Sequence, residues 1–324
     1  MTLRKLIKAY RTDRVSGWHK LRYSTRRTHG NLLNQIDRRY GRAKLRNINA
    51  RKLLKWHAAW VDGTKHHAGH AFVKKLRTVF GFGLTILEDR HCHRIRAVMS
   101  ALRFPAGKRR TQQLTARQAV AIMRQAHKRG WHSIALAQAF QFELMLRQKD
   151  VIGEWVPRRE PGESEIVYRD RKWLRGLRGS EINSELILRH TTSKRQKDIE
   201  ADLTEAPMVM AEFKRLIGKL PDGPLIVNEF NGRPFTDYEF RRKWRICADA
   251  AGVPKNVFNM DSRAGAISEA FDGEADPDFI RDTAAHSDIA TTQGYNRGSH
   301  RNRRSSVMRR RVASRAMALD QRTA

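Results

Sequence analysis

A short polar segment, residues 105–114, interrupts an otherwise regular pattern of apolar residues. It contains Pro105 and Gly107 and shows no apolar periodicity, which is typical of a linker. A chain of 324 residues also suits two hydrophobic cores better than one. The sequence therefore predicts two folded domains joined by this linker and followed by a basic tail: residues 1–104, 115–298 and 299–324.

Apolar residues of the first domain recur at helical spacing. Leu3, Leu6 and Tyr10 mark the first such stretch, and similar patterns follow within residues 32–40, 53–60 and 68–87. Asn49 is suited to cap the helix that runs through Leu53. We expect a compact helical domain with basic outer faces.

The second domain has a mixed pattern. Thr115 and Ser133 each begin a helix, the first ending at Gly130 and the second near Lys149. A capping box, Thr236 with Glu239, begins a later helix. The pattern also predicts a helix over 206–220, strands over 151–156, 185–188 and 198–203, and a turn over 191–197. We predict a mainly α fold with one small antiparallel β-sheet (α+β).

The charge of the chain is strongly unbalanced, with 65 Lys+Arg against 33 Asp+Glu and a net charge of +32. A folded chain with this surplus repels itself and needs a polyanion, so nucleic acid is the expected partner. Two cysteines, Cys92 and Cys247, exclude a disulfide-rich secreted scaffold and fit a reducing cytoplasm.

Signals for membranes and cofactors are weak. No apolar run follows the basic N-terminus, so we expect no signal peptide. The most apolar helix, Ile134 to Leu146, is interrupted by Gln138 and Gln141 and is too short for a membrane span. Two clusters suggest zinc: His66, His67 and His70, and His91, Cys92 and His93. The second cluster lacks a further ligand pair at finger spacing, and the segment that carries the first supplies no thiolate. We expect basic-surface histidines, no metal and no cofactor.

Reactive side chains occur in a fixed order in the second domain. Arg147 is followed three residues later by Asp150, and Arg263 by His286 after 23 residues and by Tyr295 after nine more. With the lysines of the 191–197 turn, this order resembles the tyrosine recombinase (phage-type integrase) family over residues 115–297. The first domain is similar to the core-binding domain of that family.

The resemblance implies a role for each residue. Tyr295 matches the nucleophile, Arg147 and Arg263 the phosphate-clamping arginines, and His286 the second-histidine position. These residue types suit the chemistry, because cations near a phenol lower its pKa and a guanidinium binds two phosphate oxygens.

The β-turn lysine of the family, a general acid, is best matched by Lys194. Lys197 is a close competitor, since the turn can be aligned either way. Asp150 matches an acidic residue that supports the active site rather than reacting.

Three positions depart from the family pattern. Met260 replaces the histidine of His-x-x-Arg, and a thioether neither exchanges a proton nor donates a hydrogen bond to phosphate. Ser262 stands where an apolar residue is usual, and Ala285 stands where glycine usually precedes the histidine.

The resemblance implies a site-specific DNA recombinase, an integrase of a phage or other mobile element. It would cut and rejoin duplex DNA through a 3′-phosphotyrosine without metal or ATP, as a homotetramer in the bacterial cytoplasm, associated with the nucleoid and aided by an accessory DNA-bending protein. No additional N-terminal DNA-binding domain is expected. Two alternatives remain: a type IB topoisomerase-like enzyme, or a catalytically decayed recombinase that only binds DNA, for which Met260 is the support.

Overall fold

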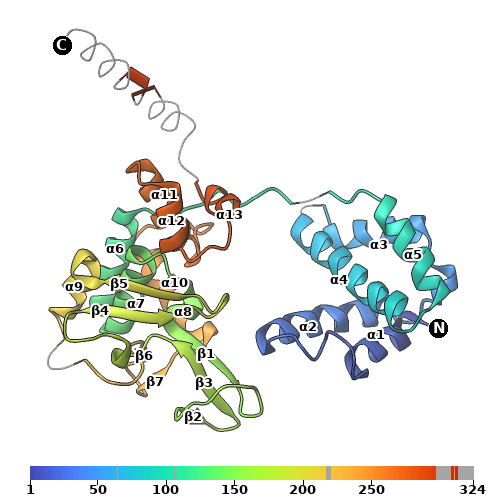
Figure 1. Ribbon diagram of the computed structural model, residues 1–324, viewed down its shortest axis with the longest axis horizontal. Coiled ribbons are helices and arrows are strands. Elements are labelled where there is room, and N and C mark those ends of the chain that lie inside the picture. The colour runs from blue at the N-terminus through green and yellow to red at the C-terminus, as the bar shows by residue number, and fades with distance from the viewer. Residues whose placement is uncertain (64, 106, 217–219, 297–307, 310, 313–324) are drawn as a thin grey trace. The chain divides into compact units, whose positions relative to one another are not determined.

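The computed structural model (Figure 1) describes the chain except for residues 64, 106, 217–219, 297–307, 310 and 313–324. It divides into two compact units, residues 1–110 and residues 111–324, and each has its own hydrophobic core. Most of the basic tail predicted over residues 299–324 lies outside the described residues.

The first unit is built from helices whose apolar faces meet in one core. Leu6, Ile36, Phe72 and Phe80 are fully buried there, and each such side chain contributes about 1.5–3 kcal/mol of transfer free energy. The predicted cap at Asn49 is confirmed, since its side chain accepts a hydrogen bond from the backbone N–H of Lys52. The helices are α1 (Leu3–Thr12), α2 (Tyr23–Tyr40), α3 (Ala50–Val61), α4 (His66–Thr85) and α5 (Arg90–Ala101).

The second unit is organised around helix α7. Residues 133–142 of this helix are buried because other helices of the unit pack around it. The predicted cap at Thr115 and the predicted capping box at Thr236 are confirmed. The helix predicted to begin at Ser133 begins at His132, and Ser133 does not cap it. The helices are α6 (Ala116–His127), α7 (His132–Glu143), α8 (Gln148–Ile152), α9 (Pro207–Phe213), α10 (Asp237–Ala250), α11 (Asp261–Asp272), α12 (Pro277–Thr283) and α13 (Ile289–Gln293).

The strands of the second unit form three small antiparallel sheets. The fold class, mainly α with small antiparallel β structure, is confirmed, but the prediction of a single sheet is wrong. Strand β3 pairs with both β1 and β2, while β4 pairs with β5 and β6 with β7. The strands are β1 (Gly153–Pro157), β2 (Val167–Tyr168), β3 (Arg171–Gly176), β4 (Ile187–Thr191), β5 (Asp198–Asp202), β6 (Val227–Asn228) and β7 (Arg233–Pro234).

Two predicted helices end early. The helix predicted to reach Lys149 ends at Glu143, because the backbone of Met145 is left-handed with φ of 51° and a new helix begins only at Gln148. The helix predicted over 206–220 ends at Phe213. The predicted turn between β4 and β5 is confirmed, closed by a hydrogen bond from the N–H of Thr192 to the carbonyl of Lys197.

Candidate active site

Arg147 lies at the start of helix α8, directly after the left-handed turn at Met145. Three residues later, the carboxylate of Asp150 is fully buried. Its Oδ2 accepts a hydrogen bond from the backbone N–H of Arg147 at 3.2 Å and lies 3.7 Å from Nη1 of the same arginine. Asp150 therefore fixes the position of Arg147.

The other oxygen of Asp150 reaches the β4–β5 turn. Its Oδ1 accepts a hydrogen bond of 2.6 Å from the backbone N–H of Ser193, the residue before Lys194. Hydrogen bonds to a charged acceptor are stronger than those between neutral groups. One buried carboxylate thus joins Arg147 to the turn that carries Lys194.

Arg263 lies in the first turn of α11 and is 5% exposed. One end of its guanidinium donates to the carbonyl of Met145 and the other to the carbonyl of Ala284. Burial, and then the neighbouring charge of Arg147, lower the pKa of Arg263 to about 10, so the group remains charged at neutral pH. Arg263 connects the segment before Arg147 with the segment before His286.

Two buried N–H groups of these arginines lack a hydrogen-bond acceptor within the described part of the chain. They are Nη1 of Arg147 and Nε of Arg263. Leaving a buried donor unsatisfied costs about 1–3 kcal/mol, and more for a charged group. An anion with several acceptor oxygens, such as a phosphodiester, satisfies donors of this kind.

His286 follows helix α12 through a tight turn. The N–H of Ala285 donates to the carbonyl of Asp282 at 2.8 Å, and the N–H of His286 donates to the carbonyl of Arg281 at 2.9 Å. This is the Schellman pattern, which places the residue before His286 in the left-handed region. Ala285 has φ of 46°, a conformation that glycine adopts without strain. The geometry explains why glycine is the favoured residue at this position.

Tyr295 lies just after α13, with its ring stacked on the imidazole of His286. The ring centroids are 5.3 Å apart and the planes differ by 20°. Nδ1 of His286 lies 2.9 Å from Oγ1 of the buried Thr292. The carbonyl of Tyr295 accepts a hydrogen bond from Oγ of Ser268, on the helix that carries Arg263. These contacts bring Tyr295, His286 and α11 together.

The cations of the cluster change the charge state of their neighbours. Burial, and then Arg263 and Arg147, lower the pKa of His286 to about 4, so its imidazole is neutral at neutral pH. The pKa of Lys194 is also lowered, first by burial and then by Arg147, Arg195 and Arg263. The site therefore concentrates positive charge on two arginines and holds a lysine that releases its proton more easily than usual.

The two candidate lysines of the turn have different surroundings. Lys194 interacts electrostatically with Arg147 and Arg263, whereas Nζ of Lys197 forms a 3.1 Å ion pair with Asp282. The ammonium group of Lys197 thus already has an anionic partner, whereas that of Lys194 lies among the cations of the cluster.

Met260 precedes helix α11, and its side chain is 63% exposed. The neighbouring Asp261 and Ser262 are fully buried. The backbone at this position is thus held by buried neighbours, while the thioether itself faces solvent.

Solved structures with a similar fold include two of lambda integrase and one from a transposon. A lambda integrase dimer bound to a COC′ core site has a TM-score of 0.68 at 15% identity, covering 91% of this chain and 77% of that one. A lambda integrase tetramer bound to a Holliday junction has a TM-score of 0.69 at 14% identity, covering 93% and 79%. The Tn1549 transposon integrase in complex with circular intermediate DNA has a TM-score of 0.66 at 12% identity, covering 95% and 99%. No protein-family model and no curated protein sequence matches the chain.

The chain has the tyrosine recombinase fold.

Within this tyrosine recombinase fold, buried polar contacts that the sequence did not reveal hold the start of α11. Gln138 of α7 donates to Oγ of Ser262 at 2.8 Å and accepts from the indole N–H of Trp244 at 2.8 Å. Gln141 and Asn259 exchange two hydrogen bonds. The only signal in the sequence was the interruption of the most apolar helix by glutamines. These contacts fix the segment from which Arg263 extends.

The zinc-like clusters of the sequence lie on α4 and α5. Cys92 is buried in the first core, and burial raises the pKa of its thiol to about 12. Among the residues that the structure describes, no group of three or more His, Cys, Asp or Glu side chains is placed to hold a metal ion. No helix in the described ranges is long and apolar enough to cross a membrane.

Proposed function

We propose that the chain is a site-specific DNA recombinase of the tyrosine recombinase family, an integrase of a phage or other mobile element acting in the bacterial cytoplasm at the nucleoid. The observation that carries the proposal is the pair of guanidinium N–H groups, one on Arg147 and one on Arg263, that find no acceptor in the described part of the chain. They belong to the cluster in which His286 stacks on Tyr295. A phosphodiester supplies the missing acceptors, and Tyr295 supplies a nucleophile.

In the proposed reaction, the phenolic oxygen of Tyr295 attacks the phosphorus and releases its proton to solvent. The bond from phosphorus to the 5′-oxygen breaks, and Lys194 donates a proton to that oxygen. The product is a 3′-phosphotyrosine and a free 5′-hydroxyl. Ligation reverses these steps, and because the phosphotyrosine retains the bond energy, neither ATP nor a metal is required.

The other residues act on the charge that develops at phosphorus. Contacts such as those of Arg147 and Arg263 each contribute about 3–4 kcal/mol to the transition state in a water-poor site. A general acid in the position of Lys194 contributes roughly 10²–10⁴-fold. The neutral imidazole of His286 stabilises this charge by donating a hydrogen bond. Asp150 holds Arg147 and the turn that carries Lys194 in fixed positions relative to each other.

The partners follow from the same proposal. Duplex DNA is favoured by the net charge of +32 and by the solved structures of similar fold, which are integrases bound to DNA. One of them is a tetramer on a Holliday junction, which supports a homotetramer here. The basic helical unit, residues 1–110, would form one half of a clamp on the duplex, and an accessory DNA-bending protein is part of the same proposal.

Replacing the nucleophile tests the proposal. On a nicked suicide duplex, the wild-type chain should form a covalent protein–DNA adduct that survives denaturation. Tyr295→Phe should bind the duplex as well as the wild type but form no adduct, since it lacks the phenolic oxygen. Tyr238→Phe, at an exposed tyrosine of α10, is the matched control and should keep the adduct. An adduct that persists in Tyr295→Phe would exclude Tyr295 as the nucleophile.

One observation favours a second candidate. Met260 presents an exposed thioether where the family carries a histidine, so the chain could be a decayed recombinase that binds DNA without cutting it. A wild-type chain that binds a cognate duplex but forms no adduct on either strand would favour this alternative.

A further inference from the structure

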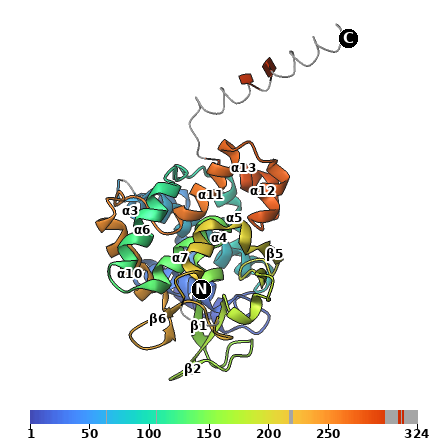
Figure 2. The same ribbon diagram turned by 90° about the vertical axis from the view of Figure 1, so that its left-hand side faces the viewer.

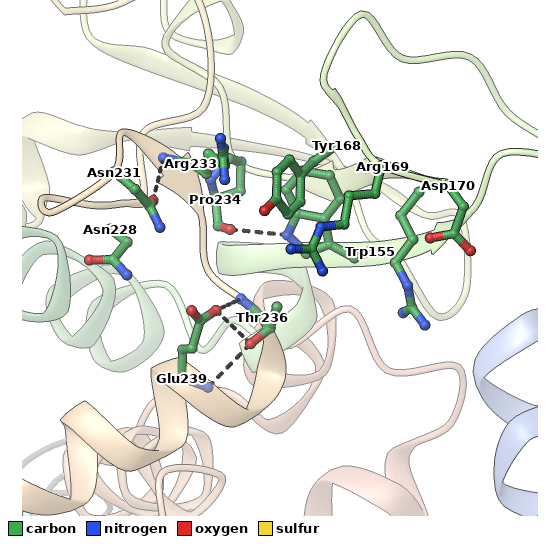
Figure 3. Close-up of a pocket in the computed structure, with 11 residues that line it drawn as sticks. Trp155, Tyr168, Arg169, Asp170, Asn228, Asn231, Arg233, Pro234, Thr236 and Glu239 are labelled. Carbon is green, nitrogen blue, oxygen red and sulfur yellow. Dashed lines mark hydrogen bonds between the residues drawn. The ribbon is translucent and has the colours of Figure 1, made fainter.

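A hollow of about 370 Å³ opens in the second unit between the turn joining β2 to β3 and the β6–β7 hairpin (Figure 3). These hairpins lie at the end of the unit opposite helices α11, α12 and α13 in both Figure 1 and Figure 2. The hollow is therefore separate from the cluster around Arg263 and Tyr295.

Aromatic rings and backbone hydrogen bonds form its wall. The indole N–H of Trp155 donates to the carbonyl of Pro234 at 3.0 Å, and its ring meets the ring of Tyr168 edge to face, with centroids 6.5 Å apart. The side-chain oxygen of Asn231 accepts a hydrogen bond from the backbone N–H of Arg233 at 3.0 Å. The hydrogen bond from Trp155 to Pro234 thus joins the β1–β3–β2 sheet to the β6–β7 hairpin within the protein itself.

Three arginines line the hollow, and we call them the arginine cradle: Arg169, Arg171 and Arg233. The guanidinium of Arg233 lies 3.8 Å from the ring centre of Tyr168, and that of Arg169 lies 5.1 Å from it. No ion pair joins a cradle arginine to a carboxylate in the ranges that the structure describes.

The acidic residues of the lining do not neutralise the cradle. Glu239 accepts hydrogen bonds from the backbone N–H and the hydroxyl of Thr236, at 3.0 and 2.6 Å. In Figure 3 it turns toward Thr236, and Asp170 points away from Tyr168. The cradle therefore presents unneutralised, partly stacked guanidinium groups to solvent.

Arg169 occupies its position at a conformational cost. It is the first of two residues in the turn between paired Tyr168 and Arg171, and its φ is 54°. Glycine or asparagine adopts this left-handed conformation more readily than arginine. Strained backbone of this kind often marks a functional position.

We propose that the arginine cradle binds phosphate groups of the DNA backbone outside the segment that is cut. A guanidinium group binds two phosphate oxygens through its planar pair of N–H groups, and the ring of Tyr168 holds the guanidinium groups of Arg169 and Arg233 in place beside it. The inference rests on the proposed function only in taking DNA as the partner.

The test compares DNA binding of full-length variants over a range of salt. Arg169→Gly with Arg233→Gln removes two cradle charges. The matched control, Lys128→Gln with Arg129→Gln, removes two exposed charges at the end of α6, next to the His127–Glu212 contact with α9. Each phosphate contact adds about −0.9 to the slope of log K against log salt, so the cradle variant should lose about 1.8 from the magnitude of the slope. Between about 50 and 200 mM salt, the wild type should then lose roughly tenfold more affinity than the cradle variant.

A single substitution separates binding from folding. Arg169→Gly relieves the left-handed backbone, so its melting temperature should equal or exceed that of the wild type while the salt slope falls by about 0.9. An unchanged slope in the cradle variants, or an equal change in the control pair, would refute the proposal. So would a cradle variant that alters self-association without DNA and leaves the slope unchanged.

The adduct assay on a short duplex keeps the two proposals apart. If the wild type forms an adduct but the cradle variants have an unchanged salt slope, only the proposal that the cradle binds phosphate is refuted. If the salt slope depends on the cradle but no adduct forms, only the proposal of recombinase activity is refuted.

Discussion

Acid should destabilise the second unit through His286. Its pKa is about 4 in the folded chain and about 6.5 in the unfolded chain. As the pH falls below about 6.5, the unfolded chain binds the proton first, so folding stability is lost progressively down to about pH 4 and is fully present above about pH 6.5. His286 is 5% exposed, so solvent screens this effect little.

The size of the loss follows from the shift. A difference of about 2.5 pKa units, at about 1.4 kcal/mol per unit, gives about 3.5 kcal/mol over the whole range. Most of it is lost between about pH 7.5 and about pH 4.5. His286→Gln cannot take up this proton and keeps a hydrogen-bonding group near Thr292, so its stability should change less over the same interval.

Urea unfolding of the two proteins at both pH values measures the difference. His132→Gln, at an exposed histidine of the same unit, should retain the full pH dependence of the wild type. If His286→Gln loses as much stability as the wild type between the two pH values, the charge state assigned to His286 is wrong.

Three further substitutions test the support of the site. Asp150→Asn weakens the hydrogen bonds to the backbone N–H groups of Arg147 and Ser193; it should cost about 1–3 kcal/mol in urea unfolding and slow adduct formation. Gln138→Leu leaves the buried indole N–H of Trp244 without its acceptor, and should cost a similar 1–3 kcal/mol by the same measurement. Met260→His adds a donor at an exposed position; adduct formation should accelerate by about tenfold, the equivalent of one charge-assisted hydrogen bond, with little change in stability. An unchanged rate of adduct formation in Asp150→Asn or Met260→His would contradict the role given to that position. Unchanged stability in Gln138→Leu would contradict the role of Gln138 as the acceptor of Trp244.

Features that depend on near neighbours in the chain were predictable from the sequence. The caps at Asn49, Thr115 and Thr236 join groups three residues apart, so the amino-acid sequence is enough to locate the starts of α3, α6 and α10. Burial of the apolar positions in α1 followed from their helical spacing. These signals are local, because a helix satisfies its backbone hydrogen bonds within its own segment.

Features that depend on distant contacts were not predictable. The β6–β7 hairpin has only two residues in each strand, and the bond from Trp155 to Pro234 that joins it to β1 spans 79 residues. The end of α7 could not be predicted from local sequence, because the left-handed backbone of Met145 is held by a hydrogen bond from Arg263, which lies 118 residues further along the chain.

The sequence by itself determined the order and spacing of the reactive residues, the helix starts and an excess of positive charge that calls for a polyanion. Only the tertiary structure decided that Asp150 joins Arg147 to the lysine turn, that His286 is neutral, and that two arginine N–H groups have no hydrogen-bond acceptor among the described residues. The physical reason is that a pKa and a missing hydrogen bond depend on burial and on neighbouring charges. In this site, residues more than 100 positions apart in the sequence supply them, as Arg147 does for His286 and Met145 for Arg263.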